Sequence, residues 1–224
     1  AELEKSSLER LSHPTVLAFL DHLVSLRKAS EICRVSADKI ARIVRALRYY
    51  SWPDRGERLD IDLSESIENT LVILQNRIKH LATVETDYGP VSPVARCGPD
   101  ISQVWANILT NACDAIEERG EGMGRIRIIT RVQDGEVITE IANNGTPIPE
   151  ELMERLYDPF FTTKPIGKGT GLGLSICVGI LRRYGGSISA RNEQGEVIFT
   201  VRLPAAGEGE DTVATTSAAE ARRC

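Results

Sequence analysis

One stretch of the chain, residues 143–175, restricts the possible folds more than any other. It contains glycines at every second position from Gly167 to Gly173, and an apolar pattern of helical spacing begins at Leu172. Alternating glycines give up side-chain burial and backbone entropy, so core packing does not explain them. A glycine-rich loop that leads into a helix gathers free amide groups and a helix N-terminus at one point, which suits a polyphosphate. A flexible linker is the alternative, but a linker has no use for the nearby aromatic pair Phe160-Phe161.

The composition is that of a globular protein. A chain of 224 residues with 42% hydrophobic residues can form a core in one domain or two. The net charge of −5 argues against nucleic acid as a partner, although Lys164, Lys168, Arg182 and Arg183 are expected to gather around the glycines. The five cysteines lack a C-x-x-C pair and lie mostly in apolar runs, which is typical of reduced core residues in a cytoplasmic protein. No segment approaches ~18 uninterrupted apolar residues, so we expect membrane attachment only through segments absent from this chain.

Residues 1–55 are predicted to form a helical hairpin. One apolar stripe of helical period covers residues 16–26 and another covers residues 32–47, with a break expected at residues 28–30. So small a hairpin has too little core to stand alone. We expect it to pair with a second copy as a four-helix bundle, unless it packs only on the rest of its own chain.

Residues 56–206 are predicted to form an α/β sandwich, which gives the whole chain an α+β fold class. Strands are expected at residues 59–63, 82–87, 125–132, 137–141, 187–191 and 196–203, and helices at residues 64–78, 100–116 and 172–184. Ser64 is the expected cap of the first helix, Pro149 opens a short extra helix, and Asp134-Gly135 predicts a hairpin turn. Residues 207–224 contain few bulky apolar residues and are predicted to be a disordered tail.

A row of polar residues is expected along one face of the helix at residues 100–116. Gln103, Asn107, Asn111 and Asp114 are spaced so that they line up on a helix surface. Asparagine is a poor helix former, so two of them one turn apart require a reason. Amide and carboxylate oxygens in a row can hold a hydrated divalent cation beside nucleotide phosphates. The alternative is an ordinary solvated helix face.

Four motifs in residues 59–204 resemble those of the catalytic, ATP-binding domain of sensor histidine kinases. QVWANILTNACDAI is similar to the family's N box, NNGTPIP to its first glycine box, DPFFTTK to its F box and GKGTGLGLS to its second glycine box. The resemblance implies the Bergerat fold of the gyrase, heat-shock-90 and MutL ATPase superfamily (GHKL). The preceding hairpin resembles the later part of a dimerisation and phosphotransfer domain.

The resemblance implies an enzyme, an ATP-dependent protein histidine kinase of a two-component system, with ATP and Mg²⁺ as cofactors. The resemblance also implies that the enzyme is a homodimer. It would transfer the γ-phosphoryl group of ATP to a histidine, for relay to an aspartate in the receiver domain of a response regulator. Asn107 would hold Mg²⁺, Asn111 would contact phosphate or ribose, and Asp114 would line the pocket. The other implied ATP-binding residues are Asn143, Gly145, Phe160, Lys164, Gly169, Thr170, Gly171, Leu172, Gly173 and Leu174, with Lys164 reaching the phosphates and Phe160 packing a hinge.

The first glycine box departs from the family pattern at two positions. Asn143 replaces an aspartate that accepts a hydrogen bond from the adenine amino group, and Pro147 replaces a glycine. Asparagine keeps an acceptor oxygen but loses the charge, which roughly halves the strength of the bond. We therefore expect weak nucleotide binding and tighter ATP binding by Asn143→Asp. Discrimination between ATP and GTP should be poor, because an asparagine amide can flip and donate.

The phosphoacceptor histidine is not evident from the sequence. The family places it in a His-Glu or His-Asp context, and the expected position falls near the start of this chain. His13 is the candidate, although Pro14 follows it, and His22 and His80 fit less well. The site otherwise lies upstream of Ala1 or has been lost. A degenerate, non-catalytic module that acts as a dimeric docking scaffold is the alternative function, and a serine-directed kinase or another ATPase of the superfamily is a third.

Overall fold

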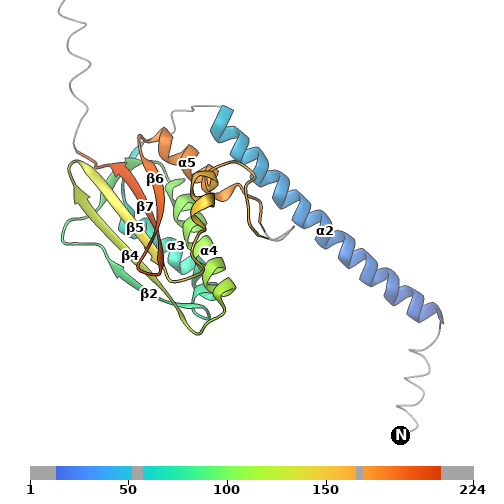
Figure 1. The fold of residues 1–224 in the computed structure, drawn as a ribbon. Helices are drawn as coiled ribbons and strands as arrows, with labels where there is room; N and C mark the ends of the chain where they lie inside the picture. The colour runs from blue at the N-terminus through green and yellow to red at the C-terminus, as the bar shows by residue number, and fades with distance from the viewer. Residues whose placement is uncertain (1–13, 52–57, 165–168, 208–224) are drawn as a thin grey trace, which may run out of the picture. The chain divides into compact units, whose positions relative to one another are not determined.

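The computed structural model describes residues 14–51, 58–164 and 169–207. The chain divides into two compact units, Ala1–Leu47 and Arg48–Cys224. Helices together with a mixed sheet confirm the predicted α+β class (Figure 1). The candidate phosphoacceptor His13 and the expected tail from residue 208 onward lie outside the described residues.

The described part of the first unit is one long helix, so the predicted hairpin is wrong. Helix α2 runs without interruption from Pro14 to Ser51, 38 residues. No glycine or proline occurs after Pro14 in this segment, so nothing at residues 28–30 ends the helix. The large apolar side chains exposed along α2 are Phe19, Leu20, Leu23, Val24, Leu26 and Ile32. The apolar spacing therefore predicted the helical period correctly but not the path of the chain.

The second unit is built on a five-stranded mixed sheet (Figure 1). Its strands are β2 (Ala82–Asp87), β4 (Gly124–Gln133), β5 (Glu136–Asn143), β6 (Ser187–Glu193) and β7 (Glu196–Pro204), in the order β2-β4-β5-β7-β6. Only β2 and β4 are parallel to each other. Strands β1 (Leu59–Asp62) and β3 (Val94–Cys97) form a separate antiparallel pair. Strand β3 was not expected, because a four-residue strand between prolines gives almost no periodic signal.

Three helices cover one face of the sheet (Figure 1). They are α3 (Leu63–Ile78), α4 (Ile101–Arg119) and α5 (Gly173–Arg183), and a 3-10 helix, η1 (Glu150–Arg155), begins after Pro149 as expected. Helix α4 lies between the other two and contacts both. Its apolar face, including Trp105, Ile108 and Leu109, is fully buried, as the spacing predicted. This burial leaves the polar residues of α4 on its remaining surface.

Helix α3 is capped by Asp62 and not by the expected Ser64. Asp62 Oδ1 accepts hydrogen bonds from the backbone N–H of Ser64 at 2.8 Å and of Glu65 at 3.3 Å. Leu63, which was expected to end the strand, therefore begins the helix. Burial would raise the pKa of Asp62, but hydrogen bonds from Ser64, Ser92 and the backbone outweigh it and lower the pKa.

We expect Asp62→Ala to lower the free energy of unfolding by about 1 kcal/mol, because it removes the cap of α3. The folded-state pKa lies below the ordinary 3.8, so the stabilisation by the carboxylate is present above that pH and is lost as the pH falls through the folded-state pKa. Asp62→Asn still caps but does not titrate in this range. Urea unfolding at about pH 7 and about pH 3 should therefore show a smaller acid loss in Asp62→Asn than in the wild type. An equal acid loss would contradict this role.

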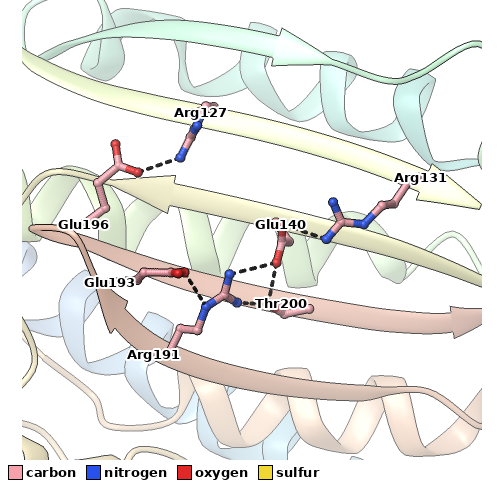
Figure 2. Close-up of polar contacts among 7 residues, drawn as sticks. All are labelled: Arg127, Arg131, Glu140, Arg191, Glu193, Glu196 and Thr200. Atoms are coloured by element: carbon pink, nitrogen blue, oxygen red, sulfur yellow. Dashed lines mark hydrogen bonds and ion pairs between the residues drawn. The ribbon is translucent and has the colours of Figure 1, made fainter.

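The opposite face of the sheet carries a network of arginine and glutamate side chains (Figure 2). Glu196 accepts hydrogen bonds from Arg125 at 2.9 Å and from Arg127 at 2.7 Å. Glu140 accepts hydrogen bonds from Arg131 and from Arg191, each at 3.1 Å. Ile198 lies on this face and is only 7% exposed. The long charged side chains thus cover apolar surface on the face of the sheet opposite α3, α4 and α5.

Candidate functional site

The predicted polar row on α4 is half-buried and is not a solvated helix face. Gln103 Nε2 donates to Asn107 Oδ1 at 3.0 Å. Asn107 Nδ2 donates to the carbonyl oxygen of Gly173 at 3.0 Å and contacts Cys177 Sγ at 3.6 Å. Both polar atoms of the Asn107 amide therefore have protein partners, and they link α4 to the first turns of α5.

The second half of the row meets the segment that precedes α5. Asn111 Oδ1 accepts from Lys164 Nζ at 3.3 Å, and within the described part of the chain this is the only polar contact of the Asn111 side chain. Asp114 accepts from Lys164 through one carboxylate oxygen and from Arg77 through the other. Burial would raise the pKa of Asp114, but the hydrogen bonds from Lys164 and Arg77 outweigh it and lower the pKa. Asp114 is therefore ionised at neutral pH.

Gly171 fixes the path of the glycine loop. It has a φ of +65°, and a Cβ atom there would lie 2.3 Å from the backbone carbonyl carbon of Phe160. The Phe160 N–H donates to the carbonyl oxygen of Gly171 at 2.8 Å. Phe160 itself has a φ of 69° and is 60% exposed, and the packing of a hinge by its ring stays a prediction. Phe160 and Gly171 therefore contact each other closely through their backbone atoms, and we call this contact the clasp.

Helix α5 begins beside the polar row with its N-terminus uncapped. Its N-cap residue, Leu172, makes no side-chain cap, and the first turn has no acidic residue. A Cβ atom on Gly173 would lie 3.7 Å from Asn107 Cγ, which places this helix end next to α4. The first N–H groups of a helix have no partner within the helix and attract anions. Gly169 and Thr170 lie half-buried just before this point, and Leu174 lies in the first turn.

The basic residues around this helix end differ from those expected. Arg182 and Arg183 lie in the last turn of α5, about 15 Å from its N-terminus at 1.5 Å per residue. Arg183 instead pairs with Asp100 at 3.0 Å. Lys168 lies outside the described residues. The cation that joins Lys164 is Arg77 from α3, which no sequence signal indicated, because a basic residue in the last turn of a helix is ordinarily explained by the helix dipole.

The first glycine box lies flat against α4. A Cβ atom on Gly145 would lie 2.5 Å from the backbone carbonyl carbon of Ala115, so the close approach requires glycine. The N–H of Thr146 donates to the carbonyl oxygen of Ala115 at 3.0 Å. Farther along, Ile148 exchanges two hydrogen bonds with the Asn192 side chain, at 2.6 and 3.2 Å. Gly145 therefore has a packing reason that is independent of any ligand.

Asn143 is 2% exposed, and its amide is held at both ends. Oδ1 accepts from the N–H of Gly145 at 3.0 Å, and Nδ2 donates to the carbonyl oxygen of Val197 at 3.3 Å. A flipped amide would face a donor with a donor and an acceptor with an acceptor. The geometry thus opposes the flip on which the expected tolerance of GTP depends.

We expect Asn143→Asp to lower the melting temperature of the nucleotide-free chain, because a carboxylate oxygen would lie near the buried carbonyl oxygen of Val197. ATP should recover that loss, because the adenine amino group would meet a charged acceptor, a gain of about 1 kcal/mol or several-fold in affinity. Thermal unfolding with and without Mg-ATP measures both effects. Asn144→Asp is the matched control. The Oδ1 atom of Asn144 accepts a hydrogen bond of 2.7 Å from the backbone N–H of Arg125, so this neighbouring asparagine has a different partner from Asn143. An equal ATP-dependent shift in both variants would show that residue 143 does not face the base.

The structure describes two of the three histidines, His22 and His80. His22 lies exposed on α2 with Nδ1 2.8 Å from the carbonyl oxygen of Ala18, and His80 is exposed just after α3.

Three of the described cysteines, Cys97, Cys113 and Cys177, are buried free thiols as expected, whereas Cys33 is exposed. Among the helices that the structure describes, none combines the length and apolar character needed to cross a membrane.

Comparison with known proteins identifies the family of the second unit. Residues 98–207 match the histidine kinase-, DNA gyrase B- and HSP90-like ATPase family. The two-component sensor PprA of Pseudomonas aeruginosa is 36% identical over 177 residues, which cover 77% of this chain but only 19% of that protein. The chain thus spans about a fifth of the length of this relative.

Two solved structures extend the match. The catalytic domain of histidine kinase ThkA is 32% identical, with a TM-score of 0.59, and the match covers 66% of this chain and 95% of that domain. Histidine kinase ThkA in complex with the response regulator protein TrrA is 27% identical, with a TM-score of 0.59, and the match covers 91% of this chain and 61% of that one. Because nearly the whole ThkA catalytic domain is matched, this chain belongs to the sensor histidine kinase family and carries its GHKL-type, Bergerat-fold ATPase domain.

Proposed function

We propose that the chain is the ATP-binding core of a two-component histidine kinase, which passes the γ-phosphoryl group of Mg-ATP to a histidine for relay to a response regulator aspartate. The observation that carries this proposal is the uncapped N-terminus of α5, which Gly171 and Asn107 hold beside Asn111 and Lys164. Free amides, a helix dipole, a lysine and amide oxygens at one point suit a nucleotide polyphosphate with its metal ion.

The donor set fits Mg²⁺ bound mainly through phosphates and water. In the described part of the chain, no group of three or more His, Cys, Asp or Glu side chains could hold a metal ion by itself. One or two protein oxygens are sufficient beside a nucleotide. Asn107 was the expected ligand, but both ends of its amide are bonded within the protein, whereas Asn111 Oδ1 contacts only Lys164 among the described residues. We therefore assign the metal-binding oxygen to Asn111 and a positioning role to Asn107.

Phosphoryl transfer depends mainly on positioning and on neutralising charge. The first-turn amides of α5 would orient the terminal phosphates, and Lys164 would neutralise them. Bound Mg²⁺ would supply further charge neutralisation. The reaction requires no covalent intermediate within this domain.

Incubation with γ-labelled ATP tests the transfer step. We expect protein-bound label that is lost in acid and retained in alkali, as for phosphohistidine, and that is removed by a receiver domain. The complex of the relative ThkA with a response regulator supports that choice of acceptor. Absence of both nucleotide binding and label would instead support the docking scaffold, with which the internally bonded Asn143 amide is consistent.

We expect the chain to be a homodimer through α2, because the apolar side chains exposed along it need cover. Light scattering at high micromolar concentration should give twice the monomer mass. Leu23→Glu, at a position that is 46% exposed, should shift the mass toward the monomer. Ser25→Glu adds the same charge at a polar position of α2 and should leave the dimer intact. A monomeric wild type would contradict this expectation.

A further inference from the structure

Asp114 is held between two cations that come from different elements. Lys164 reaches one carboxylate oxygen from the segment before α5, and Arg77 reaches the other from the last turn of α3. Arg77 also contacts Glu117 at 3.4 Å, one turn along α4 from Asp114. The Asp114 side chain is 27% exposed and that of Lys164 is 33% exposed, so solvent screens the cluster only in part.

In this arrangement Lys164 is not available to a nucleotide. Its ammonium group is bonded to Asp114 and to Asn111, the residue to which we assign the metal-binding oxygen. For Lys164 to contact phosphate, it must leave Asp114. A partly buried carboxylate that loses its only cation is strongly disfavoured. The exchange is therefore feasible only if another cation remains on Asp114.

We propose that Arg77 is a positioning residue for nucleotide binding, which keeps Asp114 paired and thereby lets Lys164 move from Asp114 to a nucleotide phosphate. This inference rests on the proposed function and adds a residue outside the sequence motifs to it. Arginine suits the role because it is always charged and offers several donors, so it contacts Asp114 and Glu117 together.

Removal of Arg77 should therefore tighten the hold of Asp114 on Lys164. We expect Arg77→Met to weaken Mg-ADP binding about tenfold in a calorimetric titration, and Arg77→Lys, which keeps the charge, to restore most of the affinity. In an Asp114→Asn background, the same Arg77→Met change should alter the dissociation constant less than about twofold, because no carboxylate remains to hold Lys164. Glu117→Gln leaves the Arg77–Asp114 pair in place and is the matched control.

Several outcomes of this double-mutant cycle overturn the proposal. An unchanged affinity in Arg77→Met would show that Arg77 only links α3 to α4. A tenfold loss that persists in the Asp114→Asn background would show that Arg77 contacts the nucleotide itself. Loss of binding in Asp114→Asn alone would show that the nucleotide needs this carboxylate directly.

Acetylation of lysines in the nucleotide-free chain, followed by mass spectrometry, provides a readout that needs no nucleotide. Lys164 should react more slowly in Arg77→Met than in the wild type, and faster in Asp114→Asn. Lys79, whose Nζ contacts the exposed Asn76 at 3.1 Å, serves as the internal reference. Equal Lys164 reactivity in the wild type and in Arg77→Met contradicts the role of Arg77. A wild type that binds no nucleotide contradicts the proposed function instead.

Discussion

Gly171→Ala should weaken nucleotide binding on the order of 100-fold while leaving the second unit folded. A side chain at this φ of +65° costs roughly 1–2 kcal/mol, and its Cβ atom would also lie 2.3 Å from the backbone carbonyl carbon of Phe160. Backbone cannot yield as the end of a flexible side chain does, so the clasp between residues 160 and 171 must open. A displacement of about 1 Å in a group that positions a ligand is sufficient for a loss of this size.

Gly195→Ala is the matched control for this prediction. Gly195 has a φ of +79° in the turn between β6 and β7, and a Cβ atom there would meet nothing within 4 Å. The variant therefore carries the same backbone strain without the collision. It should lose about 1 kcal/mol of stability and bind nucleotide as the wild type does. Thermal unfolding and titration of both variants separate strain from displacement, and an equal loss of affinity in the two would contradict the role of the clasp.

The second large effect is expected at Asn111. Removal of residues that merely orient a metal ligand typically costs 10–100-fold in metal affinity, so Asn111→Ala should weaken Mg-ATP binding by about 100-fold. In this variant, the affinity for ATP measured with Mg²⁺ present should differ little from the affinity measured after a chelator has removed Mg²⁺. Titration under both conditions measures the effect.

Asn107→Ala is the comparison that decides between the two asparagines. It removes the hydrogen bonds from α4 to Gly173 and Cys177, so it should lower the melting temperature and the overall affinity. The ratio of affinities with and without Mg²⁺ should remain that of the wild type. If Asn107→Ala loses the Mg²⁺ dependence and Asn111→Ala retains it, the metal ligand is Asn107, as the family resemblance implied.

The sequence predicted the elements whose signals are local. Strand β2 was expected with its observed bounds, and the turn at Asp134-Gly135 has the positive φ values, 52° and 77°, that the hairpin signal implies. The buried face of α4 followed from its helical spacing because no other feature of that segment competed with it. Two of the motifs contain Asn107 and Gly173, which a hydrogen bond joins at the N-terminus of α5.

The errors occurred where the outcome depends on distant contacts or on weak local preferences. The residues at positions 28–30 are all compatible with a helix, so they do not determine whether the chain turns there. Arg77 enters the site because α3 lies beside α4, a fact that only the fold supplies. Asn107 and Asn111 share one residue type and one helix face, and only their hydrogen-bond partners distinguish their roles.

One calorimetric titration of the wild type with Mg-ATP tests the central claim most directly. The claim is that the uncapped N-terminus of α5, the Asn111 oxygen and Lys164 together bind a nucleotide polyphosphate. We predict one nucleotide per chain, with a dissociation constant between about 1 μM and 1 mM, or binding of roughly −8 to −4 kcal/mol, that weakens when Mg²⁺ is chelated. No heat, together with no thermal shift at millimolar nucleotide, would contradict the claim.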